Sequence, residues 1–211
     1  MNANAPFPID IRLVQIIRKF ALLVILVVGI IFAILTDSNW PAHSAARETI
    51  EISGLLLIVG CIVGRIYCTL YIGGKKATEL VTTGPYSLCR NPLYFFSIMG
   101  AVGIGAQQGS ITLAVSTGLV IYCLFLLVIF KEESFLENRF GRKFAAYKNR
   151  VPRLLPQLSL WKEVDGPINL HPSLVRTTAL DACIILLWLP IAELLEHLHA
   201  AGALPVMFEL P

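Results

Sequence analysis

The sequence predicts an all-α integral membrane protein with about five transmembrane helices and a cytoplasmic amphipathic helix. Of its 211 residues, 56% are hydrophobic and only 15% are charged, against about 25% charged residues in a typical soluble protein. A bilayer core of about 30 Å requires about 20 apolar residues in a helix, and the chain contains several runs near that length. The composition therefore argues against a water-soluble globule and makes the lipid bilayer the first expected partner.

Five apolar runs are the expected membrane spans. The first, 20–35, extends back to Ile9 across Arg18 and Lys19 and lacks a small-residue cleavage site, so we expect it to be retained as an anchor. The remaining runs are 50–72, 93–106, 111–130 and 174–192. The run at 93–106 is short for a span and is joined to the run at 111–130 by a tight turn, which predicts a helical hairpin.

The chain is predicted to form a single membrane-embedded domain over residues 1–211. Within it we distinguish N-terminal helices at 9–72, a core at 81–156 that contains the sequence motifs, and a C-terminal helix at 174–199.

The distribution of basic residues predicts the orientation, because positively charged loops stay on the cytoplasmic side. A cytoplasmic N-terminus places 15 of the 17 Lys and Arg residues inside, with Arg47 outside and Arg65 in the membrane. This topology makes segments 73–91 and 131–173 neighbours on the cytoplasmic face, where we expect the active site. The basic residues are scattered and not clustered with aromatic side chains, so the sequence does not indicate nucleic-acid binding.

A basic amphipathic helix is expected after the fourth span. Its apolar side chains recur at helical spacing and alternate with Lys and Arg, a pattern typical of a helix on a membrane surface. We expect this helix to cover the mouth of the bundle. The apolar positions are Leu136, Phe140, Phe144, Tyr147 and Val151.

Two short segments contain the candidate chemistry. Asn91 is a suitable N-cap and Pro92 suits the first position of the third span, while Arg90 and the helix N-terminus together favour binding of a carboxylate or phosphate. Glu132 and Glu133 lie at the membrane boundary, where carboxylates are either exposed at the headgroups or held by a cationic ligand. Adjacent helical residues point about 100° apart, so one of the two can face the bundle.

The order and spacing of these residues resemble the isoprenylcysteine carboxyl methyltransferase family, which is related to the phospholipid N-methyltransferases. The resemblance covers about 81–156, roughly a third of the chain. One departure is Asn91, where many members have His, and an amide cannot act as a general base. The matching elements are Gly84-Pro85-Tyr86, Arg90-Asn91-Pro92-x-Tyr94, Glu132-Glu133-x-x-Leu136, Phe140-Gly141, Tyr147 and Arg150-Val151-Pro152-Arg153 through Pro156.

The resemblance implies an S-adenosylmethionine site on the cytoplasmic side of the bundle. Carboxylates would face the sulfonium and ammonium groups of this cofactor, and Arg90 with the helix N-terminus would face its carboxylate. The expected cofactor-binding residues are Gly84, Tyr86, Arg90, Asn91, Pro92, Tyr94, Glu132 and Glu133. The expected catalytic residues are Arg90, Glu132 and Arg153, and the expected substrate-binding residues are Tyr147, Arg150 and Arg153.

The predicted reaction is methyl transfer to a lipophilic or lipidated acceptor, with the carboxylate of an isoprenylcysteine-like substrate as the first choice. A phospholipid amine is the alternative, for which Glu132 would accept a proton. A membrane reductase that uses a nicotinamide cofactor is a more distant alternative. The five cysteines form no CxxC pair, and we expect no metal site.

Overall fold

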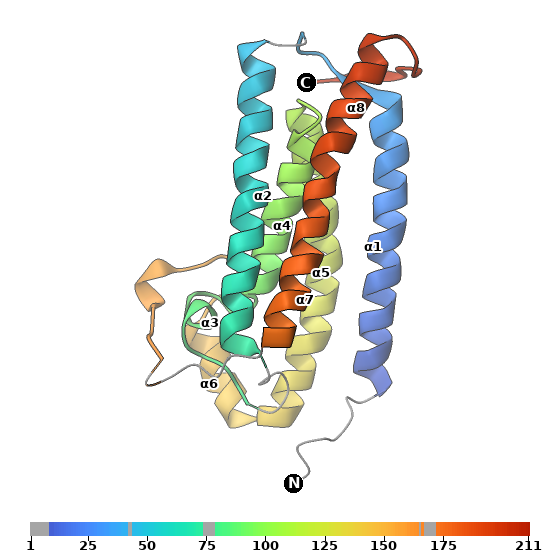
Figure 1. Ribbon diagram of the computed structural model, residues 1–211. Helices are drawn as coiled ribbons and strands as arrows, with labels where there is room; N and C mark the ends of the chain where they lie inside the picture. The colour runs from blue at the N-terminus through green and yellow to red at the C-terminus, as the bar shows by residue number, and fades with distance from the viewer. Residues whose placement is uncertain (1–8, 42–43, 74–78, 165, 167–171) are drawn as a thin grey trace.

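The computed structural model describes residues 9–41, 44–73, 79–164, 166 and 172–211, and these form a bundle of roughly parallel helices (Figure 1). Lys75 and Lys76, which contribute to the predicted orientation, lie outside the described residues. In chain order the elements are α1 (Ile9–Leu35), β1 (Thr36–Ser38), α2 (Ala45–Ile72), α3 (Pro85–Leu88), α4 (Pro92–Ala106), α5 (Ile111–Phe140), α6 (Arg142–Arg150), η1 (Leu158–Leu160), α7 (Pro172–Cys183), η2 (Ile184–Leu187), α8 (Trp188–Ala200) and β2 (Phe208–Leu210).

The described residues contain four helical segments that are long and apolar enough to cross a membrane, together with the shorter α4. The long segments are Leu13–Leu35, Ala45–Ile72, Ile111–Phe140 and Pro172–Ala200. The prediction of an all-α membrane protein with about five spans is confirmed. At 1.5 Å per residue α4 is only about 22 Å long, less than the bilayer core, and it packs between α2 and α5.

Close contact between α2 and α4 depends on small residues. A Cβ atom added at Gly103 would lie 2.6 Å from the carbonyl oxygen of Gly54, and one added at Gly100 would lie 2.6 Å from the sulfur of Cys61. In lipid, association of helices relies on such close packing because apolar side chains gain little by leaving apolar solvent. Larger residues at these positions would force the two helices apart.

The amphipathic segment differs from its prediction. α5 continues through Leu136 to Phe140, and the chain bends only at Gly141, whose φ of 51° is readily adopted by glycine. The surface helix is therefore the shorter α6. Phe144 and Tyr147 are buried and pack against Leu80, so this apolar stripe covers protein. The position of this helix relative to the membrane surface stays a prediction, but its buried apolar side chains contact neighbouring segments of the chain.

The C-terminal segment consists of α7, η2 and α8, and α7 packs against α2. Its helix tightens to a 3₁₀ turn at Ile184–Leu187, just before Pro190. Proline lacks the N–H that an α-helix requires and its ring crowds the preceding turn. Next to this irregularity, the indole N–H of Trp188 donates to the carbonyl of Ile104 at 3.0 Å, which ties α8 to α4.

The two ends of the bundle are chemically different. At one end lie the beginning of α1, the short α3 and α6 (Figure 1), which confirms that segments 79–91 and 131–164 are neighbours. At the other end β1 and β2 form a parallel pair. There the buried Arg47 forms ion pairs with Asp37, Glu51 and Glu196 at 3.6, 3.0 and 3.2 Å.

The cytoplasmic placement of the α6 end is a prediction from charge, and exposed residues at the two ends can test it. A single cysteine at Ala201, in a variant without native cysteines, should react with an impermeant thiol reagent added to intact cells, whereas one at Ser159 should not. Both positions are exposed, so reactivity reports the side of the membrane. Labelling at Ser159 without labelling at Ala201 would invert the topology.

Candidate functional site

A buried carboxylate, Glu133, lies at the centre of the α6 end. It is 5% exposed although it is ionisable, and burial of an unpaired charge is costly. Arg90 donates to both oxygens of Glu133, from Nε at 2.8 Å and from Nη2 at 3.2 Å. Asn91 and Arg153 each donate one further hydrogen bond at 3.1 Å. We call Arg90, Asn91, Glu133 and Arg153 the Glu133 network.

Arg90 also binds the backbone of the segment that follows α6. Its Nη1 donates to the carbonyl of Lys148 at 2.9 Å and to that of Val151 at 2.7 Å, and its backbone N–H donates to Pro152 at 2.8 Å. Four of the five guanidinium N–H groups therefore have partners within the protein. Arg90 joins the start of α4, the end of α5 and the end of α6.

Asn91 occupies the predicted N-cap position of α4, but its side chain binds elsewhere. Its side chain forms no capping bond; Nδ2 instead donates to Glu133 and to the carbonyl of Arg153 at 3.1 Å. The predicted N-cap position is confirmed, and the backbone carbonyl of Asn91 accepts from the N–H groups of Tyr94 and Phe95 at 3.1 Å. Pro92 does occupy the first turn, as predicted.

Gly84, Tyr86 and Tyr147 form the wall beside this network. Gly84 has a φ of 59°, and a Cβ there would lie 2.2 Å from the ring of Tyr71. The Tyr147 hydroxyl donates to the carbonyl of Tyr86 at 2.6 Å, and among the described residues the Tyr86 hydroxyl has no partner. Burial raises the pKa of both Tyr86 and Tyr147, so both hydroxyls stay protonated and neither is suited to act as a base.

Glu132 belongs to a second cluster, which lies toward α1. The amide of Gln15 in α1 donates to Glu132 at 2.7 Å, and Arg18 donates to the hydroxyl of Tyr94 at 3.1 Å. Glu132 also faces that hydroxyl. We call Gln15, Arg18, Tyr94 and Glu132 the α1 cluster. Unlike Glu133, Glu132 and Arg18 are only partly buried.

The structure thus separates residues that sequence reasoning had placed in one cavity. Glu132 and Glu133 were both expected to face the cofactor together with Arg90. In the structure Glu133 and Arg90 bind each other, and Glu132 points toward α1. The approximate 100° between adjacent helical side chains accounts for this separation.

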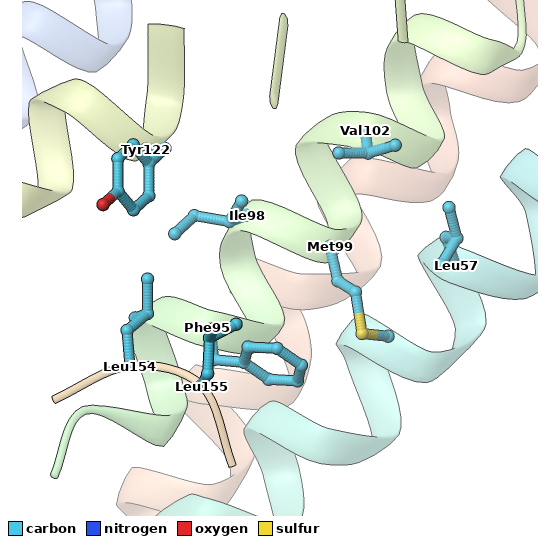
Figure 2. Close-up of a pocket in the computed structure, with 8 residues that line it drawn as sticks. All are labelled: Leu57, Phe95, Ile98, Met99, Val102, Tyr122, Leu154 and Leu155. Atoms are coloured by element: carbon cyan, nitrogen blue, oxygen red, sulfur yellow. The ribbon is translucent and has the colours of Figure 1, made fainter. Parts of the chain in front are cut away.

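An apolar groove opens beside the Glu133 network. It has a volume of about 360 Å³, within the usual range for small-molecule sites. Figure 2 shows α4 side chains on its floor, Tyr122 and Leu57 on either side, and Leu154 and Leu155 at one end. The lining residues are Leu57, Phe95, Ile98, Met99, Val102, Tyr122, Leu154 and Leu155.

Arg153 immediately precedes the two leucines at the end of this groove. Its guanidinium carbon lies 4.5 Å from the centre of the Phe130 ring, a distance typical of a cation–π contact. Nε is bound by Glu133, but the side chain remains 35% exposed. Arg153 therefore presents a fixed and accessible positive charge near the apolar groove. Arg150, at the end of α6, is exposed.

Comparisons with known proteins place the chain in a family. A family model described as phospholipid methyltransferase matches residues 49–143. The nickel-cobalt-cadmium resistance protein NccN of Alcaligenes xylosoxydans xylosoxydans is 34% identical over 98% of this chain and 95% of its own length. The chain belongs to the phospholipid methyltransferase family. No solved structure matches it.

Two further relatives show the breadth of this family. The cobalt-zinc-cadmium resistance protein CzcN of Cupriavidus metallidurans is 35% identical over 75% of this chain and 76% of its own length. Protein-S-isoprenylcysteine O-methyltransferase B of Arabidopsis thaliana is 32% identical over 37% of this chain and 40% of its own length. The resemblance found from the motifs is confirmed. Among the described residues, no group of three or more His, Cys, Asp and Glu side chains is placed to hold a metal ion.

Sequence reasoning missed Gln15 and Arg18 as members of the site. Arg18 was considered only as part of a loop charge, and both residues lie outside the segment that the family model matches. A signal was nevertheless present: Gln15 and Arg18 are three residues apart, and therefore on one face of α1. Phe130, beneath Arg153, gave no comparable signal because it ends an apolar run.

Replacement of Arg90 by Ala should destabilise the fold by about 3 kcal/mol, because it leaves Glu133 buried with fewer charged partners. Replacement by Lys should recover only part of the lost stability, since Lys lacks the forked guanidinium that binds both oxygens of Glu133. Arg142→Ala is the matched control: Arg142 is exposed and the change should stay within about 0.5 kcal/mol. The free energy of unfolding in mixed micelles measures the difference. Equal stability of Arg90→Ala and Arg142→Ala would contradict a structural role for the network.

Proposed function

We propose that this protein transfers a methyl group from S-adenosylmethionine to a lipophilic acceptor, and that the preferred acceptor is the carboxylate of an isoprenylcysteine-like compound. The observation that carries the choice of acceptor is the position of Arg153, an accessible cation that immediately precedes two leucines of the apolar groove. An anionic head would contact Arg153 while an apolar tail lies along α4. Tyr147 and Arg150 remain proposed contacts of the acceptor.

The α1 cluster supports the cofactor proposal. S-adenosylmethionine has a positively charged sulfonium and an ammonium group, and a carboxylate is the side chain that best accommodates them. Glu132 is partly exposed and forms no ion pair among the described residues, so it fits this need. Tyr94 provides a hydroxyl beside it. Within this proposal Gly84, Tyr86 and Pro92 shape the wall of the cofactor site.

We assign a positioning role to Arg90, Asn91 and Glu133. Their hydrogen bonds are directed at one another and at the backbone of residues 148–153, which leaves little capacity for a ligand. They would fix Arg153 and the groove relative to α4 and α5. Direct contact of Arg90 with the cofactor carboxylate, as the sequence predicted, is not part of this proposal.

The proposed reaction needs no nucleophilic side chain. The bound cofactor supplies an electrophilic methyl group. A carboxylate acceptor is already ionised at pH 7, so its oxygen can form the new bond to carbon as the bond from carbon to sulfur breaks, and no proton needs to move. The protein then has to align the two partners and exclude water, which by itself can lower the barrier by several kcal/mol. Arg153 would hold the attacking carboxylate, and Glu132 the cofactor.

Other functions remain as alternatives. The description of the matching family favours a phospholipid amine as acceptor, which would require a base such as Glu132. The names of NccN and CzcN favour a part in resistance to nickel, cobalt, zinc or cadmium, and methylation of a membrane component is compatible with that part. A nicotinamide-dependent reductase would bind NADPH in place of S-adenosylhomocysteine.

The acceptor assay offers radiolabelled S-adenosylmethionine together with either a farnesylcysteine analogue or phosphatidylethanolamine. We expect methylation of the former, with kcat/KM about tenfold lower in Arg153→Ala, the loss typical of one charge-assisted bond. Arg153→Lys should recover part of it, and Arg142→Ala should behave as the wild type. Methylation of the phospholipid alone, with a steep dependence on pH, would support the amine alternative. Binding of NADPH without S-adenosylhomocysteine would exclude methyl transfer.

Narrowing the groove tests the position of the acceptor tail. Met99→Trp should raise KM for a farnesylated acceptor by about tenfold, since loss of about two buried methylenes costs about 1.6 kcal/mol. Leu158→Trp is the matched control, because Leu158 is 77% exposed and lies outside the groove. The affinity for S-adenosylhomocysteine should not change. Equal KM values in both variants would remove the groove from the proposal.

A further inference from the structure

We propose that Arg18 and Glu132 together bind the amino-acid end of S-adenosylmethionine: Arg18 donates to its carboxylate and Glu132 accepts from its ammonium group. This inference rests on the proposed function and deepens it by assigning a cofactor contact to α1. It replaces Arg90, which the sequence favoured for the carboxylate.

Arg90 is unsuitable for binding the cofactor carboxylate because four of its five guanidinium N–H groups already have partners. Its side chain is 7% exposed, and Glu133 already occupies the fork of the guanidinium. A second carboxylate there would have to displace Glu133 and leave a buried charge without its main partner. Among the cationic groups of the described chain, Arg18 is the one that donates into the cluster containing Glu132 and Tyr94.

Most hydrogen-bond donors of the Arg18 side chain are available for a ligand. Within the described residues its one hydrogen bond runs from Nη1 to the Tyr94 hydroxyl at 3.1 Å, and it forms no ion pair there, so most of its five N–H groups remain available. Glu132 uses one oxygen to accept from Gln15 at 2.7 Å. Both side chains are partly exposed, so a ligand can reach them.

The arrangement of the charges suits a zwitterion. Arg18 and Glu132 both face the Tyr94 hydroxyl, yet no ion pair joins them in the described structure. The Tyr94 hydroxyl therefore lies between the guanidinium of Arg18 and the carboxylate of Glu132. An amino acid has its ammonium and carboxylate on one carbon, so both groups can be satisfied at once by opposite charges with this spacing. Gln15 would keep Glu132 turned toward the site.

The location of Arg18 makes the proposal specific to this fold. The segment matched by the family model begins at residue 49, after the whole of α1 (Ile9–Leu35). Binding of the cofactor at the α1 cluster would thus recruit a helix that is otherwise mostly exposed to its surroundings. It would also give a role to Gln15 and Arg18, which lie on one face of that helix.

Binding calorimetry with three ligands separates the two halves of the site. The ligands are S-adenosylhomocysteine, its decarboxylated analogue adenosyl-3-thiopropylamine, and 5′-methylthioadenosine, which lacks the amino-acid end. We expect Arg18→Ala to weaken S-adenosylhomocysteine about tenfold, the effect of one lost charge-assisted bond, and to leave the decarboxylated analogue within about twofold. Glu132→Gln should weaken both of these ligands and leave 5′-methylthioadenosine unchanged.

Two further variants control for indirect effects. Lys19→Ala removes an adjacent exposed charge and should change none of the three affinities, while Arg18→Lys should recover part of the lost affinity. An equal loss for all three ligands in Arg18→Ala would show that Arg18 acts only on the fold and would overturn the proposal. If Arg18→Ala keeps the wild-type ratio of affinities for S-adenosylhomocysteine and the decarboxylated analogue, the proposal is overturned as well, while the proposed function stays intact. No binding of S-adenosylhomocysteine to the wild type would overturn both.

Discussion

Glu133 imposes the strongest constraint on this structure, because a carboxylate at 5% exposure requires several donors. Arg90, Asn91 and Arg153 supply them from two separate parts of the chain. The hydrogen bonds to this one carboxylate therefore fix the start of α4 against the end of α5. It also fixes the segment after α6, and through that segment the position of Arg153 and the adjoining leucines.

The same constraint gives different roles to two adjacent, chemically identical residues. Glu133 has its donors within the protein, whereas Glu132 lies on another side of α5 and meets α1. A charge that is fully satisfied internally is a poor ligand, since any new partner must displace an old one. A partly exposed charge with one neutral donor is a better one. The different surroundings of the two carboxylates thus follow from helix geometry.

Packing in the membrane explains the rest of the site. α4 is short and rich in glycine, so α2 approaches it closely on one side. On the face that includes Phe95, Ile98 and Met99, an apolar groove remains beside the charged end of the bundle. A polar head and an apolar tail could therefore be bound by neighbouring parts of one surface. The mostly exposed α1 supplies polar groups to Glu132 and Tyr94.

The sequence by itself determined the membrane class, the helical spans, the family and the residues of the Arg90-Asn91-Pro92 and Glu132-Glu133 motifs, because composition, run length and motif spacing are local properties. Only the tertiary structure decided which residues bind one another. Asn91 takes the predicted N-cap position of α4, but its side chain binds Glu133. Phe144 and Tyr147 were assigned to the membrane surface and are buried by protein. Arg18 joined the site from more than 70 residues before Tyr94. These outcomes depend on contacts between distant segments, and the competition among donors for one buried carboxylate is settled only when those segments meet.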